Sequence, residues 1–166
     1  MELIKAQVTT PWQPLSVIVD VAQVPTIVAA AFEPMSHVIA KADLQHVSIA
    51  NDKTLAGVAT IVNRWVDGDV DAFDDVHVRQ SGGPFMQECW KALRTVRGGT
   101  VVTYAQLAEL AGRPMAIRAA GTACATNLIA PFIPCHRVVR TGGDIGNYGF
   151  GVNLKRQILA HEGVSI

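Results

Sequence analysis

Apolar and polar residues alternate in three short runs near the start of the chain, at Ile4 to Val8, Leu15 to Val21 and Thr26 to Phe32. Prolines separate these runs. Alternation with a period of two is typical of β-strands, and proline interrupts strand pairing. The pattern therefore predicts a small antiparallel sheet in the first half of the chain.

A helical pattern follows between Asp52 and Val66, and Asp52 is placed to cap its start. Its apolar residues recur three or four positions apart, at Leu55, Val58, Ile61, Val62 and Trp65. We expect this helix to cover the sheet. The acidic run at 66–71 resembles the start of a calcium loop but lacks the later glycine and glutamate, so we interpret it as a solvated turn.

The second half changes to helical patterns. Pro84 can begin a helix whose apolar face ends before Gly98 and Gly99. Residues 103–106 form a capping-box sequence, with Leu107 and Leu110 as the expected apolar face of the next helix. A third helix is predicted from Arg113-Pro114 to about Thr126. Two helices joined by so tight a turn indicate a helix-turn-helix, although a plain helical hairpin has the same pattern.

The fold class is accordingly α/β, in the sense of α+β: a small sheet with its covering helix, then a mostly helical domain. Residues 81–84, Ser-Gly-Gly-Pro, are the best linker candidate. We expect a scaffold domain at 1–80 and a second domain at 85–166.

Composition narrows the functional classes. The chain has 166 residues, of which 49% are apolar, enough to bury a core. It has no apolar run long enough for a membrane span and no signal-peptide pattern, so we expect an intracellular, cytoplasmic protein, or a nuclear one in a eukaryote. The three widely spaced cysteines favour neither a disulfide framework nor a metal knot.

Charge is divided unequally between the two halves. Residues 1–84 hold five Lys or Arg against ten Asp or Glu, a net charge of −5, whereas residues 85–166 hold nine against four, a net charge of +5. A polyanion would be attracted to the second half. The helix expected at 115–125 is built almost entirely from small residues, and Arg118 is its single long polar side chain. Such a helix suits close approach to a neighbouring helix or to a DNA minor groove, with Arg118 placed to fill a gap in the base stack.

Cys135 stands between Pro134 and the pair His136-Arg137 in an apolar stretch. An ordinary thiol has a pKa near ~8.5, so a thiolate at neutral pH needs a downward shift of roughly 2.5 units. His136 and Arg137 are candidate sources of that shift. A buried structural cysteine is the alternative for an isolated Cys-His pair.

The sequence Pro-Cys-His-Arg-Val at 134–138, the preceding helix pair, Gly-Asn-Tyr-Gly at 146–149 and Leu-Ala-His-Glu-Gly at 159–163 together resemble the O6-alkylguanine-DNA alkyltransferases, also called methylated-DNA-protein-cysteine methyltransferases. The resemblance is close over residues 85–163. It implies a ribonuclease-H-like first domain and a winged-helix-like second domain. It also implies minor-groove binding, flipping of a damaged guanine, and irreversible transfer of its alkyl group to a cysteine.

The resemblance implies a role for each matching residue. Cys135 is the alkyl acceptor, activated by His136 through a water molecule, with Glu162 orienting the imidazole. Tyr104 donates to the departing guanine, Lys155 assists at the guanine oxygen, and Asn127 holds the cysteine segment. The implied DNA contacts are Thr103, Tyr104, Arg118, Ala119, Thr122 and Ala125. The implied guanine pocket consists of Pro134, Val138, Ile145, Asn147, Tyr148, Gly149 and Phe150.

Phe150 and Cys124 depart from the family pattern. Phe150 either narrows the pocket against bulky adducts or packs into the core, and Cys124 stands where relatives often carry a larger residue. The expected partner is double-stranded DNA containing O6-alkylguanine, with O4-alkylthymine as a second candidate. We expect a monomer without cofactor or metal, and cooperative binding along DNA stays open. The alternatives are a non-catalytic lesion binder, a transcriptional regulator and a cysteine hydrolase.

Overall fold

The structure is a computed structural model that describes residues 1–166. The chain forms two compact units. Unit 1 contains Met1–Gln80 and Leu128–Phe132, and unit 2 contains Ser81–Asn127 and Ile133–Ile166. The assignment of Leu128–Phe132 to unit 1 differs from the predicted boundaries, which place these residues in the second domain.

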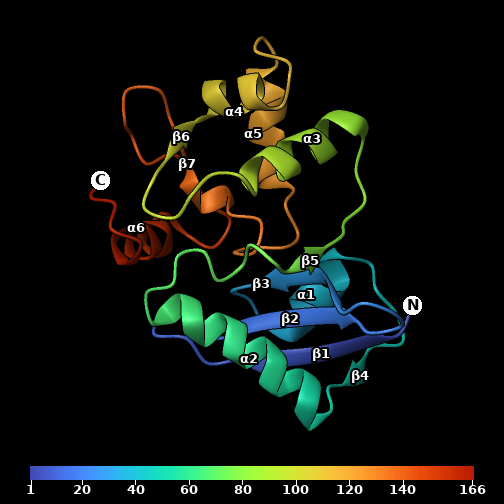
Figure 1. Cartoon of the computed structure of the whole chain (residues 1–166). Coiled ribbons are helices and arrows are strands. Elements are labelled where there is room, and N and C mark those ends of the chain that lie inside the picture. Colours follow the sequence, from blue (N-terminus) through green and yellow to red (C-terminus); the bar gives the residue numbers. More distant parts are fainter. The chain divides into compact units, whose positions relative to one another are not determined.

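Unit 1 is built on a five-stranded sheet in the order β4-β1-β2-β3-β5 (Figure 1). Its central strands β1 (Leu3–Val8), β2 (Leu15–Asp20) and β3 (Thr26–Ala31) are antiparallel, as the alternating pattern predicts. The edge strands β4 (Ser48–Ile49) and β5 (His77–Val78) pair in parallel with β1 and β3. The sheet is therefore mixed rather than wholly antiparallel. Two-residue strands are too short to show alternation, so the sequence pattern does not predict them.

Two helices pack on this sheet. Helix α1 (Met35–Lys41) contacts β2 and β3, and α2 (Asp52–Val66) contacts β1. In Figure 1, α2 crosses in front of the strands and α1 lies behind them. Helices over both faces explain why every residue of β2 is buried. The bounds of α2 match the prediction, but its cap is Asn51, whose side chain accepts a hydrogen bond from the Thr54 backbone N–H at 2.8 Å.

The returning segment at 128–132 completes unit 1. Ala30 of β3 forms two backbone hydrogen bonds with this segment, of 2.8 and 3.1 Å. The ring of Phe132 lies 4.6 Å from that of Phe73, centroid to centroid. The segment therefore extends the hydrogen bonding of β3 and contributes to the apolar core of unit 1.

Unit 2 holds three mutually packed helices, α3 (Pro84–Leu93), α4 (Tyr104–Leu110) and α5 (Ile117–Ala125). The buried indole N–H of Trp90 on α3 donates to the Ala123 carbonyl on α5 at 2.9 Å. Because Pro84 is the first residue of α3, it belongs to the helix and not to the predicted linker.

The predicted capping box at the start of α4 is present. Thr103 accepts from the Gln106 backbone N–H at 3.1 Å, and the Gln106 side chain accepts from the Thr103 N–H at 2.8 Å. Leu107 is fully buried, as expected for the apolar face of this helix. Leu110 is 55% exposed, so the prediction that it belongs to the same buried face is wrong. Helix α5 begins at Ile117, later than predicted, because residues 113–116 form a turn.

A short parallel pairing joins β6 (Val102–Thr103) to β7 (Val138–Val139). The 3-10 turn η1 (Cys135–Arg137) directly precedes β7 and packs against helix α6 (Val152–His161). These contacts hold the Cys-His-Arg sequence between two regular elements. None of the helices has the length and apolar character needed to cross a lipid bilayer.

Candidate active site

Cys135 is the first residue of η1, and its thiol lines a pocket of about 590 Å³ in unit 2. The residue is only 8% exposed. The side-chain amide of Asn127 donates to the Cys135 Sγ at 3.3 Å and to the Ile133 carbonyl at 2.8 Å. Asn127 therefore holds both the thiol sulfur and the chain that leads to it.

Several residues predicted from the sequence share this pocket with Cys135. The predicted residues that line it are Tyr104, Arg118, Thr122, Ala125, Asn147, Tyr148 and Gly149. Four further lining residues were not among the predicted site residues: Ile117, Gly121, Cys124 and Arg140. Ile117, Gly121 and Cys124 lie at helical spacing on the side of α5 that carries Ala125, a periodicity that could have identified them.

Other predicted residues do not line the pocket, although each lies in unit 2. The predicted pocket residues outside the lining are Pro134, Val138, Ile145 and Phe150. The Phe150 ring packs edge-on against Tyr148, with centroids 5.1 Å apart. Phe150 thus contacts a lining residue without lining the pocket itself. Thr103 and Ala119, predicted to contact DNA, also lie outside the lining, and Thr103 caps α4.

His136, Glu162 and Arg137 form a buried ionic cluster. The His136 Nε2 lies 2.9 Å from the Glu162 Oε1. The Arg137 guanidinium donates to both Glu162 oxygens, at 3.0 and 2.6 Å, and to the Val96 carbonyl at 2.8 Å. The Arg137 charge is therefore directed at Glu162, which argues against its predicted role as a source of the thiol's pKa shift.

The cluster fixes the protonation of its members. Burial would raise the pKa of Glu162, but His136 and Arg137 outweigh it and hold that pKa well below its ordinary value. The carboxylate is therefore ionised and accepts the Nε2–H of His136. Burial lowers the pKa of His136, against the opposing effect of Glu162. The imidazole is then neutral at pH 7, with Nδ1 as its proton-accepting atom.

Burial also raises the pKa of the Cys135 thiol, whereas the Asn127 hydrogen bond and the Lys155 charge oppose the rise. Cys135 is thus a neutral thiol at rest, contrary to the thiolate expected from its neighbours in sequence. A neighbouring base must remove its proton before it can act as a nucleophile.

Lys155 is fully buried on α6, and burial lowers its pKa from 10.5 to about 8. Its Nζ donates to the Val138 carbonyl at 2.6 Å and to the Asn147 carbonyl at 3.0 Å. Lys155 therefore links the strand that follows η1 to the loop that forms one wall of the pocket.

Tyr104 approaches the same loop from the start of α4. A Cβ atom added at Gly146 would lie 3.3 Å from the Tyr104 hydroxyl oxygen, and Gly146 has φ +73°. Only glycine accommodates both the close approach and this backbone conformation without strain. Burial raises the pKa of Tyr104, so its hydroxyl stays protonated and is a hydrogen-bond donor in the pocket lining.

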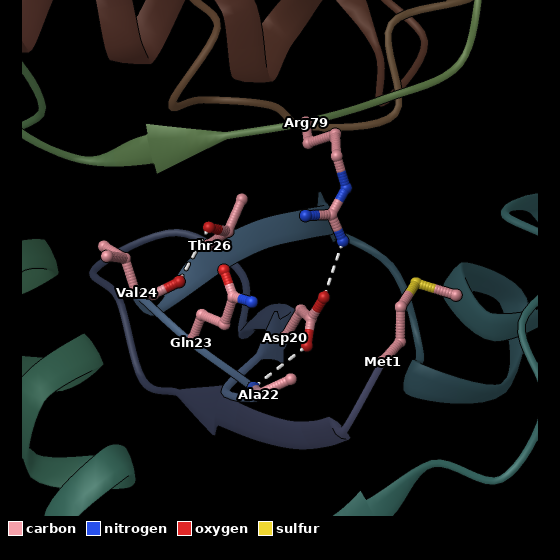
Figure 2. A pocket seen from close by; sticks show the side chains of 7 residues that line it. All are labelled: Met1, Asp20, Ala22, Gln23, Val24, Thr26 and Arg79. Atoms are coloured by element: carbon pink, nitrogen blue, oxygen red, sulfur yellow. Dashed lines mark hydrogen bonds and ion pairs between the residues drawn. The ribbon is translucent and has the colours of Figure 1, made fainter.

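Two other pockets lie in unit 1, and neither is lined by a cysteine. The one shown in Figure 2, of about 450 Å³, contains the Asp20–Arg79 ion pair at 2.6 Å. The other, of about 580 Å³, has mostly apolar walls between α2 and the sheet. No group of three or more His, Cys, Asp or Glu side chains is placed to hold a metal ion.

Comparison with known proteins identifies the class of this fold and site. Residues 84–164 match the family described as 6-O-methylguanine DNA methyltransferase, DNA binding domain. The chain is 33% identical to a methylated-DNA–protein-cysteine methyltransferase of Shigella flexneri, over 98% of this chain and 97% of that protein. It is 52% identical to the Rattus norvegicus protein of the same name, over 47% of this chain and 38% of the relative.

A solved structure gives the same result for the fold. The crystal structure of Mycobacterium tuberculosis OGT in complex with DNA has a TM-score of 0.76 and 27% identity, over 96% of this chain and 92% of that one. The chain belongs to the methylated-DNA–protein-cysteine methyltransferase family, the enzyme class that its sequence predicts.

Proposed function

We propose that this protein repairs DNA by transferring the alkyl group of O6-alkylguanine in a duplex to Cys135, in a single irreversible turnover. The observation that carries the proposal is the placement of the Cys135 thiol in a pocket, next in sequence to a buried histidine that is held by an ionised carboxylate. A stoichiometric repair protein needs one protected nucleophile and a base that is ready to accept its proton.

His136 acts as the general base. Its Nε2–H is donated to Glu162, so the lone pair of Nδ1 accepts the Cys135 proton, through a water molecule. The carboxylate stabilises the imidazolium that forms, and Asn127 donates to the developing thiolate. A thiol that is neutral at rest is then activated only during reaction.

The transfer step forms a bond between Sγ and the alkyl carbon and breaks the bond between that carbon and the guanine oxygen. The departing guanine takes up a proton from Tyr104, whose hydroxyl is protonated at neutral pH. His136 returns the cysteine proton toward the tyrosine, so that charge and protons balance. The thioether product contains no S–S bond, so a thiol cannot release the alkyl group by exchange, and each molecule is spent once.

The duplex is expected to bind across the exposed face of α5. This face is smooth at Gly121, Thr122 and Ala125, which all line the pocket, and Arg118 rises from its first turn. Small residues permit close approach in a minor groove, and Arg118 is placed to fill the gap that a flipped guanine leaves. Phe150 lies outside the pocket lining, so we expect the pocket to accept a benzyl adduct as well as a methyl group.

The test is intact-protein mass spectrometry after incubation with a duplex that contains one O6-methylguanine. The wild type is expected to gain the mass of one methyl group, and Cys135→Ser to gain none. Cys124→Ser is the matched control, because Cys124 lines the same pocket, and this variant should still gain the methyl group. Tight binding of the lesion without any mass gain would support the non-catalytic lesion binder instead.

A further inference from the structure

Exposed apolar side chains in unit 2 concentrate at the turn between α4 and α5. Leu110 is 55% exposed, Met115 95% and Ile117 45%, and the remaining large apolar residue exposed in this unit is Ile166, the last residue of the chain. Single exposed apolar residues are ordinary, but three fall within eight positions of the chain here, and concentrated apolar exposure marks interaction sites.

Only Ile117 of these three residues lines the pocket. Ile117 begins α5 and lines the pocket beside Arg118, whereas Leu110 ends α4 and does not line it. Apart from Arg118, the other pocket-lining residues of α5 are small, so Ile117 is the one large aliphatic side chain of α5 in the lining. Met115, two residues earlier, extends the apolar surface away from the pocket.

Cations flank this apolar lip, defined here as Met115 and Ile117. Arg118 and Arg140 line the same pocket and are exposed, and Arg113 lies in the turn itself, 5.5 Å from the centre of the Phe85 ring. An apolar lip flanked by arginines complements a polyanion that has an apolar interior. Duplex DNA has that character, with phosphates outside and stacked bases inside, and proteins that bind its minor groove insert apolar wedges between base steps.

We propose that the Met115–Ile117 lip is such a wedge, which enters the minor groove at the base step beside the displaced nucleotide while Arg118 fills the vacated position. This inference rests on the proposed function for the choice of partner. Ile117, at the rim of the pocket, closes the mouth against water. The wedge contributes an affinity that is independent of salt, and it favours lesions beside easily unstacked steps.

Binding of duplex DNA measured at several salt concentrations tests the wedge. Ile117→Ala is expected to weaken binding about tenfold at every salt concentration, because it removes buried methylene groups but no charge. The slope of log K against log salt stays unchanged, whereas Arg118→Ala lowers it by about one. Ile117→Leu keeps the apolar volume and should retain the affinity. Leu110→Ala is the matched control and should bind like the wild type.

A second readout follows base unstacking directly. With 2-aminopurine in the step next to O6-methylguanine, the wild type and Leu110→Ala should raise its fluorescence, and Ile117→Ala with Met115→Ala should not. Ile117 is exposed at a helix start, so the alanine variant is expected to fold, which thermal unfolding checks.

The outcomes separate the two proposals. Unchanged affinity in Ile117→Ala and unchanged fluorescence in the double variant Ile117→Ala with Met115→Ala, with methyl transfer intact in the wild type, would overturn the wedge alone. Dependence on Ile117 without a methyl gain on Cys135 would support the wedge and overturn the transfer. A wild type that binds no DNA overturns both.

Discussion

The Nε2 atom of His136 lies 2.9 Å from the Oε1 atom of Glu162, and neither side chain is open to solvent. The same carboxylate accepts hydrogen bonds from the Nε and Nη2 atoms of the Arg137 guanidinium. The buried Glu162 carboxylate is therefore the hydrogen-bond acceptor for both His136 and Arg137, which are consecutive residues of η1. This shared dependence gives Glu162 a part in the stability of the fold, beside its proposed part in the reaction.

Glu162→Gln should lower the free energy of unfolding by about 3 kcal/mol, because it leaves the buried Arg137 charge without a compensating anion. Urea unfolding of the wild type and the variant measures the difference. Glu109→Gln, at an exposed position on α4, is the control and should change stability by less than about 0.5 kcal/mol. Equal effects of the two substitutions would show that the buried cluster contributes little.

The rate of methyl transfer should stay constant as the pH falls to the ordinary histidine value of 6.5 and decline only below it. Burial lowers the pKa of His136, so the neutral base persists into mildly acidic solution. Single-turnover rates on saturating methylated duplex, at constant ionic strength, give the profile. A decline with an apparent pKa above 6.5 would contradict a buried neutral imidazole as the base.

Unit 1 should lose stability in acid through Asp20. Hydrogen bonds from Arg79, and from the backbone N–H groups of Glu2 and Ala22, lower the pKa of Asp20 from 3.8 to about 2. A lowered folded-state pKa stabilises the protein above pH 3.8, and this contribution disappears as the pH falls toward 2. Arg79 is half exposed and screened by solvent, so we expect about 1 kcal/mol.

The check is the pH dependence of urea unfolding between pH 5 and pH 2. Asp20→Asn should flatten it relative to the wild type, and Arg79→Met should reproduce part of that effect. Asp52, exposed in the first turn of α2, supplies the control as Asp52→Asn. If the three variants follow the same curve as the wild type, the ion pair does not contribute to acid stability.

Lys155→Met should cost about 2 kcal/mol of stability at pH 7, because the carbonyls of Val138 and Asn147 lose their donor in a buried setting. The pKa of Lys155, lowered from 10.5 to about 8, also makes the stability depend on pH. Burying the charged amine is unfavourable, and this penalty fades as the pH rises from 8 to 10.5. The wild type should therefore gain stability relative to Lys155→Met over that range. Lys91→Met, exposed on α3, should show neither effect.

Gly57→Ala should raise stability by about 1 kcal/mol, because glycine in a helix interior is less favourable than alanine. Gly57 lies within α2, and a Cβ atom there would meet no heavy atom within 4 Å. Gly68→Ala is the contrast. A Cβ atom at Gly68 would also meet no heavy atom within 4 Å, but Gly68 has φ +106°, so alanine at this position should destabilise the protein. Thermal unfolding of both variants measures the two shifts, and a loss in Gly57→Ala would contradict the open environment.

Local patterns in the sequence predicted local structure well. The spacing from Asp52 to Val66 gives the bounds of α2, and the Thr-x-x-Gln sequence gives the cap of α4. Neither pattern depends on distant residues. The exposure of Leu110 was not predictable in this way, because helical spacing shows that a face is apolar but not how far the neighbouring helices cover it.

The sequence predicted many of the residues that gather at the site. It did not predict their ion pairs or protonation states. Adjacency in sequence suggested that Arg137 would act on Cys135, but successive residues of η1 project in different directions, and Arg137 meets Glu162 instead. Burial of the thiol likewise depends on the packing of the whole unit. The sequence also gave no reason to place residues 128–132 in unit 1, since a short wholly apolar run has no periodicity that distinguishes one core from another.

The placement of Leu128–Phe132 in unit 1 affects any attempt to divide this protein. The chain passes between the two units three times, after Gln80, after Asn127 and after Phe132. A fragment that starts at Ser81 would carry the apolar pentapeptide 128–132 without the strand it pairs with, and this pentapeptide ends three residues before Cys135. Proteolysis at the glycine-rich linker would therefore nick the chain without releasing an intact unit, because residues 128–132 of unit 1 would remain on the second fragment.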